Sequence, residues 1–256
     1  MSASEVSVCA IAPAHVDLGV QSRIPDAVLS PNSRDGLAGS VAAAAEIGSD
    51  WIWIVGHGVD PAPDALARLL APLPDAGPLA DPVILASKVV LPNGSLDLDA
   101  APWPRLLARE LAMLGAEHRL AALRAVRYGS ILVARRAVAR HGPPRRDFTG
   151  ASDLEWTGRI LRDDPGFLIP ASVVTRRLPL SVARRAYVRD LVRILRGDGW
   201  SGQERVWFAF RLGQHVVDRA VAQPSAIPDL LLGLTSGLLA RDSRRGRNGA
   251  PQTPTI

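Results

Sequence analysis

Apolar residues along the chain gather into short runs that alternate with segments of helical periodicity. The runs "VSVCAIA" (6–12), "WIWIV" (51–55) and "GFLIPASVVT" (166–175) are almost continuously apolar. Such runs are typical of strands that are covered on both faces of a sheet. Two further strands are predicted at 26–31 and 81–94. The alternation predicts an α/β fold with a mainly parallel sheet flanked by helices.

Helix signals lie between these runs. An alanine-rich segment predicts a helix that stops at Gly48, and Pro61 marks the start of the next helix. Another helix is expected around 105–115, and "AVRYGSILVARRAVARHG" reads as a strand followed by a short helix that ends at Gly142. In "SDLEWTGRILR", Ser152 has a glutamate three residues on, which is the spacing of a capping box.

The pattern changes in the last third of the chain. Residues 179–241 show helical periodicity interrupted by "GDGWSG" and "QPSAIPD", with no further strand pattern. The final stretch, 242–256, is polar, and we expect it to be disordered. The sequence therefore predicts an α/β domain over 1–178, a helical appendage over 179–241 and a tail.

The composition is that of a globular protein, with 47% hydrophobic and 21% charged residues. The one cysteine, Cys9, excludes an internal disulfide or a thiolate metal cluster. The chain shows no secretory signal and no run of about 18 apolar residues. We expect a cytoplasmic protein, or one bound at the inner face of the cell membrane. Helices at 181–222 mix Trp, Phe, Leu and Arg, so a peripheral membrane contact, a helical cap and a dimer contact all stay open.

The net charge of +5 comes almost entirely from arginine, since Lys88 is the only lysine. Arginine suits bidentate contacts with phosphate, although a genomic preference for arginine codons accounts equally well for the excess. Basic residues are interleaved with acidic ones and do not form an aromatic-rich patch. We therefore expect no nucleic-acid partner.

A histidine between two glycines follows the strand 51–55, in "VGHGVD". Ligands of α/β sheets bind beyond the carboxyl ends of the strands. The turn Gly56, His57, Gly58 is therefore a candidate site.

The order of the motifs resembles a known family. The chain runs "RDGLAGSVAAAAEIGSDWIWIVGHGVDPAPDALARLL", "VILASKVVLPNGSL", "VRYGSILVARRAVARHG" and "DFTGASDLEWTGRILRDDPGFLIPASVVTRR". Over about 30–178 this set resembles a family 2 glycosyltransferase of the GT-A fold. The helical remainder is similar to the tail of rhamnosyl- and galactofuranosyltransferase-type members. The resemblance implies a nucleotide-sugar donor, UDP- or TDP-linked, and a hydroxyl of a glycan or lipid-linked cell-envelope acceptor.

The resemblance also implies a metal-binding acidic DXD motif, which is degenerate here. Gly56 and Gly58 cannot ligate through side chains, and the lone imidazole of His57 suits Mg²⁺ poorly. We therefore assign no metal ligand and disfavour Mn²⁺ or Mg²⁺, so that His57 becomes a turn residue or a substrate contact. Where family members have a second metal-ligating histidine, this chain has Arg176, with Arg177 beside it. Their guanidinium groups are candidates to neutralise the pyrophosphate without a metal.

Further site residues come from the same resemblance. Asp153 matches the family's general base and Glu155 is the second choice, although both also suit the N-terminus of a helix. Arg159 either faces the sugar phosphate or pairs with a nearby acid. Asp35 and Gly36 match the family's glycine turn near the nucleotide.

The nucleotide-binding region is abbreviated, and "PAHVD" with His15 is the nearest polar cluster at a strand end. His15 suits a surface loop as well as a nucleotide contact. Together with the degenerate motif, this shortening supports an alternative function: a catalytically inactive pseudoglycosyltransferase that acts as a binding or partner protein.

Overall fold

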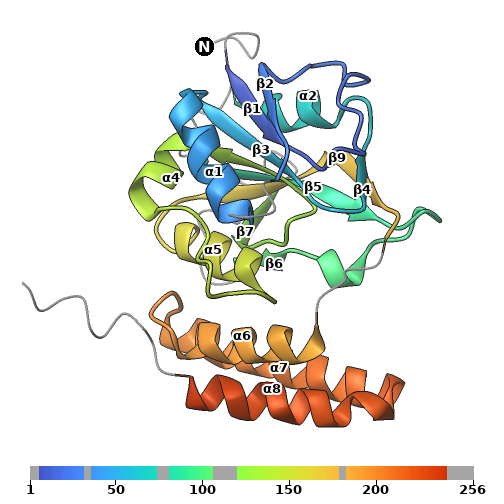
Figure 1. Ribbon diagram of the computed structural model, residues 1–256, viewed down its shortest axis with the longest axis vertical. Helices are drawn as coiled ribbons and strands as arrows, with labels where there is room; N and C mark the ends of the chain where they lie inside the picture. The colour runs from blue at the N-terminus through green and yellow to red at the C-terminus, as the bar shows by residue number, and fades with distance from the viewer. Residues whose placement is uncertain (1–5, 32–35, 74–80, 106–119, 179–182, 241–256) are drawn as a thin grey trace, which may run out of the picture. The chain divides into compact units, whose positions relative to one another are not determined.

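The structure, a computed structural model, describes residues 6–31, 36–73, 81–105, 120–178 and 183–240 (Figure 1). The chain divides into two compact units. The first comprises residues 1–148 and 152–181, and the second comprises 149–151 and 182–256. The predicted helix around 105–115 and the predicted tail 242–256 lie outside the described residues, apart from Arg105.

The first unit is built on a nine-stranded sheet with the order β2-β1-β3-β8-β5-β9-β7-β6, and β4 pairs separately with β9. The strands are β1 (Val8–Ile11), β2 (Ala27–Leu29), β3 (Trp51–Val55), β4 (Val59–Pro61), β5 (Ile84–Val90), β6 (Trp103–Pro104), β7 (Ala121–Ala125), β8 (Ser130–Ala134) and β9 (Gly166–Arg176). Strands β4, β7 and β8 run against the other six, so the sheet is mostly parallel, as predicted.

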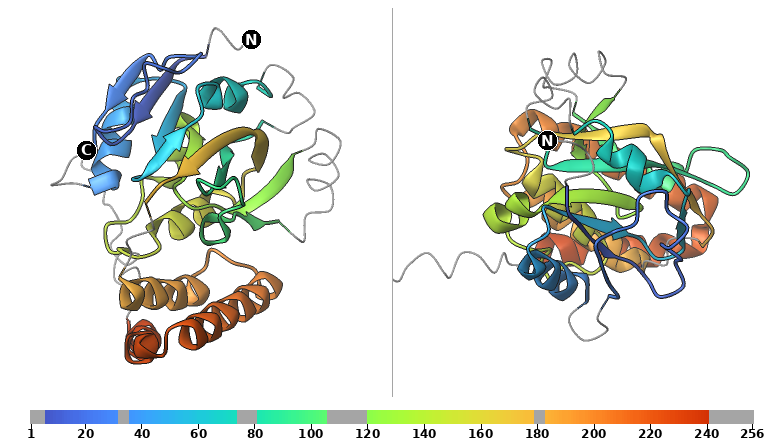
Figure 2. Two further views of the ribbon diagram at one scale, coloured as in Figure 1. Left: turned by 90° about the vertical axis from the view of Figure 1, so that its right-hand side faces the viewer. Right: turned by 90° about the horizontal axis from the view of Figure 1, so that it is seen from above.

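Helices cover both faces of this sheet. The helices of the first unit are α1 (Gly36–Ile47), α2 (Ala65–Leu70), α4 (Arg135–His141), α5 (Ser152–Ile160) and the 3₁₀ turn η1 (Leu98–Ala100). Helices α1, α4 and α5 form a row along one face, and α2 packs against β5 and β9 on the other (Figure 2). The α/β prediction is confirmed.

The continuous apolar runs became the central strands. Every residue of β1, β3 and β8 is buried, as expected for strands with side chains covered on both faces. Helix α1 is followed by Gly48 at φ +90° and α4 by Gly142 at φ +74°, the left-handed conformation that ends helices readily at glycine. Both predicted stops are confirmed.

One helix start was predicted wrongly. Helix α2 begins at Ala65, whereas Pro61 ends β4 and lies opposite Val174 of β9. Proline has no N–H to donate, which restricts it to strand edges of this kind. The local sequence signal for a helix start was therefore outweighed by pairing with a distant strand.

The second unit contains helices only, within the residues that the structure describes. They are α6 (Arg184–Arg196), α7 (Gly202–Ala222), the 3₁₀ turn η2 (Pro224–Ala226) and α8 (Ile227–Leu239), coloured orange to red in Figure 1. A Cβ at Gly237 of α8 would lie 2.6 Å from the Cβ of Val192, and one at Gly233 would lie 2.9 Å from that of Val188. These glycines let α8 approach α6 closely.

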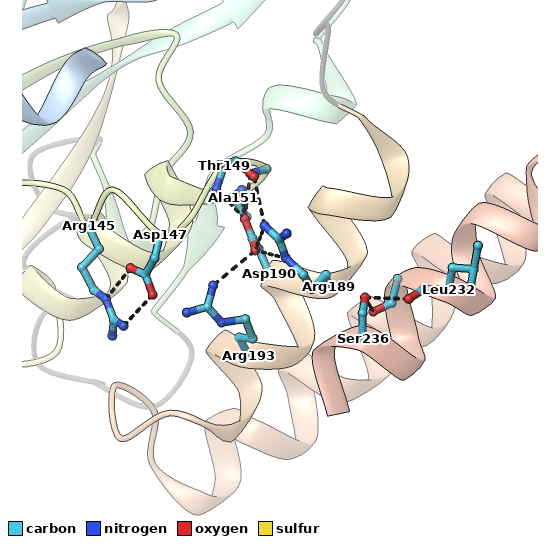
Figure 3. Close-up of polar contacts among 11 residues, drawn as sticks. Arg145, Asp147, Thr149, Ala151, Arg189, Asp190, Arg193, Leu232 and Ser236 are labelled. Atoms are coloured by element: carbon cyan, nitrogen blue, oxygen red, sulfur yellow. Dashed lines mark hydrogen bonds and ion pairs between the residues drawn. The ribbon is translucent and has the colours of Figure 1, made fainter. Parts of the chain in front are cut away.

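Asp190 explains why residues 149–151 belong to the second unit (Figure 3). Its Oδ2 accepts the backbone N–H groups of Thr149, Gly150 and Ala151 at 2.8, 2.7 and 3.3 Å. The side chain is fully buried, and Arg189 balances its charge at 2.7 Å. A carboxylate that accepts several backbone bonds is a strong anchor. Nothing in the local sequence of 149–151 announces this attachment to α6.

Candidate functional site

The turn after β3 requires glycine at two positions. Gly56 donates its N–H to Gly129 O at 2.8 Å, and a Cβ at Gly56 would lie 2.0 Å from Tyr128 O. Gly58 has φ +70°, and a Cβ there would lie 2.6 Å from the Cβ of Leu178. No side chain fits at Gly56 without moving backbone. Glycine at position 56 is therefore required by the way this turn packs against Tyr128.

Two histidines meet at the ends of neighbouring parallel strands. Strand β1 pairs with β3 in parallel, so the loops that follow them lie at the same edge of the sheet. His15 and His57 are exposed, and their rings lie edge to face with centroids 5.1 Å apart. The polar cluster around His15, which the sequence suggested as a nucleotide contact, therefore lies beside the turn that carries His57.

The end of β9 lies against the same turn. Val59 of β4 is in register with Arg176, and Arg177 donates its N–H to Gly58 O at 2.8 Å. Arg177 is exposed and its guanidinium pairs with Asp60. The structure therefore brings together His57 and the backbone of both arginines.

Arg176 is buried, with 7% of its surface exposed. Its Nη2 lies 2.5 Å from Asp97 Oδ1 and 3.9 Å from Asp99 Oδ2. Its Nε and Nη1 are buried with no hydrogen-bond partner among the described residues. Asp97 Oδ2 is likewise buried and has no hydrogen-bond partner among these residues. Asp97 also caps η1 by accepting the N–H groups of Asp99 and Ala100. Part of this buried ion pair is therefore left unsatisfied.

Asp153 belongs to the same polar network as Arg176. Its Oδ2 lies 3.1 Å from Arg127 Nε, and its Oδ1 accepts the N–H of Leu154 at 2.9 Å. Arg127 also donates to Asp99 O at 3.4 Å, so Arg127 and Asp99 connect Asp153 to Arg176. Both acids and both arginines come from segments far apart in sequence. Both oxygens of Asp153 are engaged in this arrangement.

Glu155 and Arg159 form a pair one turn apart on α5. Arg159 Nε lies 3.1 Å from Glu155 Oε1, and the guanidinium also donates to His141 O and Pro143 O. These bonds hold Arg159 to the connection between α4 and α5. Ser152 is the first residue of α5 and does not precede the helix as the predicted N-cap would. The carboxylate of Glu155, the other residue of the predicted capping box, accepts a hydrogen bond from Arg159.

Tyr128 packs against α5. Its hydroxyl donates to Ser152 O at 3.4 Å, and its ring lies 6.2 Å from that of the buried Trp156. Burial raises the pKa of the Tyr128 phenol well above its ordinary value, and the charges of Asp153 and Glu155 raise it further. The phenol stays protonated as a hydrogen-bond donor.

Ser130 belongs to a buried network of hydrogen-bonded serines. Its hydroxyl accepts Trp53 Nε1 at 3.0 Å and bonds Ser87 at 2.8 Å, and Ser87 bonds Ser172 at 2.8 Å. All three serines are buried, and they join β8, β5 and β9 beneath the site. Of the glycine turn expected near the nucleotide, Gly36 begins α1 at φ +58°, whereas Asp35 lies outside the described residues.

A divalent cation does not fit the turn. Mg²⁺ and its relatives prefer several carboxylate or carbonyl oxygens, and this turn offers one imidazole at His57. Within the described ranges, no group of three or more His, Cys, Asp or Glu is arranged to hold a metal ion.

Sequence reasoning missed Arg127, Asp97 and Asp99 as members of the site. The acids stand two apart in "GSLDLDA", directly after a strand, and this spacing was the available signal. Arg127 precedes Tyr128 in "VRYGS", and the local sequence carries no signal of its pairing with Asp153.

No helix in the described part of the chain combines the length and the apolar composition needed to cross a bilayer.

No protein-family model matches the sequence, and no curated protein matches it. Several solved structures are similar to this chain. TarS from S. aureus is 8% identical with a TM-score of 0.51, over 81% of this chain and 42% of that one. The mannosyltransferase PcManGT from Pyrobaculum calidifontis, solved with GDP-Man and Mn²⁺, is 14% identical with a TM-score of 0.49, over 93% of this chain and 76% of that one. The chain has the GT-A-like fold of glycosyltransferases, with a mostly parallel central sheet flanked by helices.

Proposed function

We propose that the protein is a glycosyltransferase that moves a sugar from a UDP- or TDP-linked donor to a hydroxyl of a glycan or lipid-linked cell-envelope acceptor. The observation that carries this proposal is the backbone contact between the His57 turn and the end of β9, Arg177 N–H to Gly58 O. It gathers cationic groups at the strand ends, where α/β folds bind ligands. The GT-A-like fold supports the same donor class.

The donor diphosphate would be neutralised by side chains. Arg177 and the imidazoles of His57 and His15 are exposed at this edge of the sheet. Arg176, the last residue of β9, is buried against Asp97, and two of its donor nitrogens have no partner among the described residues. Forked guanidinium donors suit phosphate oxygens, and fixed cations stabilise charge that develops on a leaving group.

The transfer itself breaks the bond between the anomeric carbon and the diphosphate oxygen and forms one to the acceptor oxygen. The proton of the acceptor hydroxyl passes to a carboxylate, for which Asp153 remains our first choice and Glu155 our second. Arg127 and the start of α5 fix the position of Asp153. The nucleoside diphosphate leaves with the negative charge that the arginines balance.

The ion pairs favour a second candidate function. Both proposed bases are held by arginines, Asp153 by Arg127 and Glu155 by Arg159. A protein that keeps these pairs on ligand binding would hold a nucleotide sugar or a glycan without transferring the sugar. This is the pseudoglycosyltransferase alternative.

Calorimetric titration with UDP, TDP and their sugar conjugates, in EDTA and in Mn²⁺, tests the proposal. We expect binding of at least one nucleotide in EDTA, with no strict requirement for the metal. Ligand at a hundredfold excess over Kd stabilises the native state by about 2.7 kcal/mol, so the melting temperature should rise. Absence of binding by every nucleotide, or binding only with Mn²⁺, would contradict the proposal.

Variants locate the binding site. Arg177→Ala and His57→Ala should each weaken nucleotide binding about tenfold, which corresponds to the loss of one hydrogen-bonded contact of about 1.4 kcal/mol. Arg68→Ala is the matched control, because Arg68 forms a similar exposed pair with Asp64 on α2. Release of nucleoside diphosphate from the bound donor then separates the two functions. Binding without release, with a range of acceptors, would identify the pseudoenzyme.

A further inference from the structure

Helix α7 carries an apolar stripe on its exposed face. Four large apolar side chains of this helix are each more than half exposed: Val206, Phe210, Val217 and Val221. Their spacings of four, seven and four residues match the period of an α-helix, so they lie along one face. Phe208 and Leu212 are buried on the opposite face. Large apolar side chains that gather on one surface mark an interaction site.

Gly213 lies at the centre of this stripe, with two of the apolar residues before it and two after it. A Cβ at Gly213 would meet no atom within 4 Å, whereas Gly233 and Gly237 of α8 are both crowded by α6. Packing among the described residues therefore does not require glycine at position 213. Glycine is less favourable than alanine in a helix interior, but it allows another backbone to approach closely. A second helix that crosses α7 at this point would use that space.

The symmetry of the stripe about Gly213 indicates which helix this is. We propose that α7 binds α7 of a second copy of this chain, in an antiparallel pair with a two-fold axis at Gly213. A two-fold axis brings a surface against itself, so the surface must be self-complementary. In this pair Val206 lies opposite Val221 of the other copy, and Phe210 lies opposite Val217. The two glycines then meet at the crossing point.

Arg211 and Asp218 give the antiparallel pair complementary charges. Both are exposed, and they lie on the same flank of the stripe, one on each side of Gly213. The guanidinium of Arg211 leans towards the stripe, with Nη1 3.5 Å from Gln214 Oε1 and Cζ 6.0 Å from the centre of the Trp207 ring. The two-fold axis brings each Arg211 level with Asp218 of the other copy, to within about 3 Å along the helix. Two exposed ion pairs of this kind fix the register more than they add affinity.

The size of the contact predicts a weak dimer. Helix α7 has 21 residues and is about 31 Å long. One helix pair of this length belongs with the small interfaces, below about 1,200 Å². Sedimentation velocity of the full-length protein between about 1 and 200 μM should therefore show a monomer–dimer equilibrium with a Kd of about 10–100 μM. Species larger than the dimer are not expected, because a two-fold contact closes.

Substitutions in the stripe test its role. Phe210→Glu/Val217→Glu should raise the Kd of the dimer at least tenfold, because it places like charges in the contact. The matched control is Leu231→Glu/Leu238→Glu on α8, where both leucines are also more than half exposed, and its Kd should be unchanged. Circular dichroism checks that each variant is folded, which is expected because the substituted side chains are exposed.

Gly213→Leu separates a role in association from a role in folding. The larger side chain should hold the helices apart and raise the Kd at least tenfold. The melting temperature of the monomer should rise by about 2 °C, since leucine favours the helix and nothing obstructs its Cβ. Arg211→Glu should raise the Kd about fivefold at low salt, and Arg211→Glu/Asp218→Arg should restore it.

Cysteine cross-linking tests the antiparallel direction. The one native cysteine, Cys9, is buried. With oxidised glutathione, Gly213→Cys and Val206→Cys/Val221→Cys should each form a covalent dimer. Val206→Cys alone should not, because the two copies of position 206 lie about 22 Å apart along an antiparallel pair, beyond the reach of a disulfide.

Three outcomes would overturn the proposal. They are a monomer at every concentration, a dimer that the Phe210→Glu/Val217→Glu variant does not weaken, and efficient cross-linking of Val206→Cys alone. Self-association does not depend on the proposed enzymatic function. Loss of nucleotide binding therefore leaves this inference unaffected, and a monomeric protein that binds nucleotide would contradict only the dimer.

Discussion

Arg176 donates to Asp97 through Nη2 at 2.5 Å, while its other two nitrogens are buried with no partner among the described residues. Burying a guanidinium costs free energy unless each donor finds an acceptor. Two donors of Arg176 and one carboxylate oxygen of Asp97 therefore stay buried without a hydrogen bond among the described residues.

Arg176→Met should lower the free energy of unfolding by about 3 kcal/mol, because it leaves Asp97 buried without its counter-charge. The double variant Arg176→Met/Asp97→Asn should recover part of this loss, since the amide oxygen still caps η1 and carries no charge. Urea unfolding followed by circular dichroism measures both. A loss in the double variant equal to the sum of the losses in Arg176→Met and Asp97→Asn would show that the two side chains are not coupled.

The raised pKa of Tyr128 should lower the free energy of unfolding in alkaline solution. Its folded-state pKa is raised by burial and by Asp153 and Glu155, so the unfolded chain releases the phenolic proton at lower pH than the native protein. Above about pH 10, loss of the proton from the unfolded chain therefore shifts the equilibrium towards the unfolded state. The free energy of unfolding falls by up to about 1.4 kcal/mol per pH unit because of this group. Tyr128→Phe should have a shallower fall in urea unfolding measured between about pH 9 and pH 11. An unchanged slope would place the tyrosine outside this environment.

The two candidate bases can be separated by comparing activity with stability. Asp153→Asn removes the buried ion pair with Arg127 and should cost about 3 kcal/mol of stability. Glu155→Gln should cost only about 1 kcal/mol, because Arg159 keeps the carbonyls of His141 and Pro143.

If Asp153 is the base, turnover per folded molecule falls by at least about a hundredfold in Asp153→Asn and changes little in Glu155→Gln. Single-turnover donor consumption, normalised to the folded fraction, is the measurement. The reverse pattern would assign the base to Glu155.

Asp190 anchors residues 149–151 to α6. Asp190→Ala removes the acceptor of three backbone N–H groups and the counter-charge of Arg189, so a loss of at least about 3 kcal/mol is expected. Amide hydrogen exchange at Gly150 should accelerate, which reports on the anchor directly. Asp229→Ala, at an exposed position, should change stability by less than about 0.5 kcal/mol. Slow exchange at Gly150 in the Asp190 variant would contradict this role.

Hydrophobic patterning predicted the central strands well. The run Trp51–Val55 is apolar at every position, and burial on both sides of the sheet requires this. The same pattern carries no information on strand direction, so the antiparallel placement of β8 between β3 and β5 could not be predicted. Strands β4 and β6 have three and two residues and exist through pairing with distant partners.

The site was predictable only in part for the same reason. The adjacency of His57 to the end of β9 follows from both lying at strand ends. Arg127 and Asp99, which join Asp153 to Arg176, come from separate loops, and only the tertiary fold brings them together.

The crowding at Gly56 limits how this turn can be redesigned. An aspartate at that position would require the peptide at Tyr128 to retreat, because its carbonyl oxygen would otherwise lie 2.0 Å from the new Cβ. A carboxylate therefore cannot be introduced here by substitution of Gly56 alone, and a redesign that needs one would first have to rebuild the loop at Tyr128.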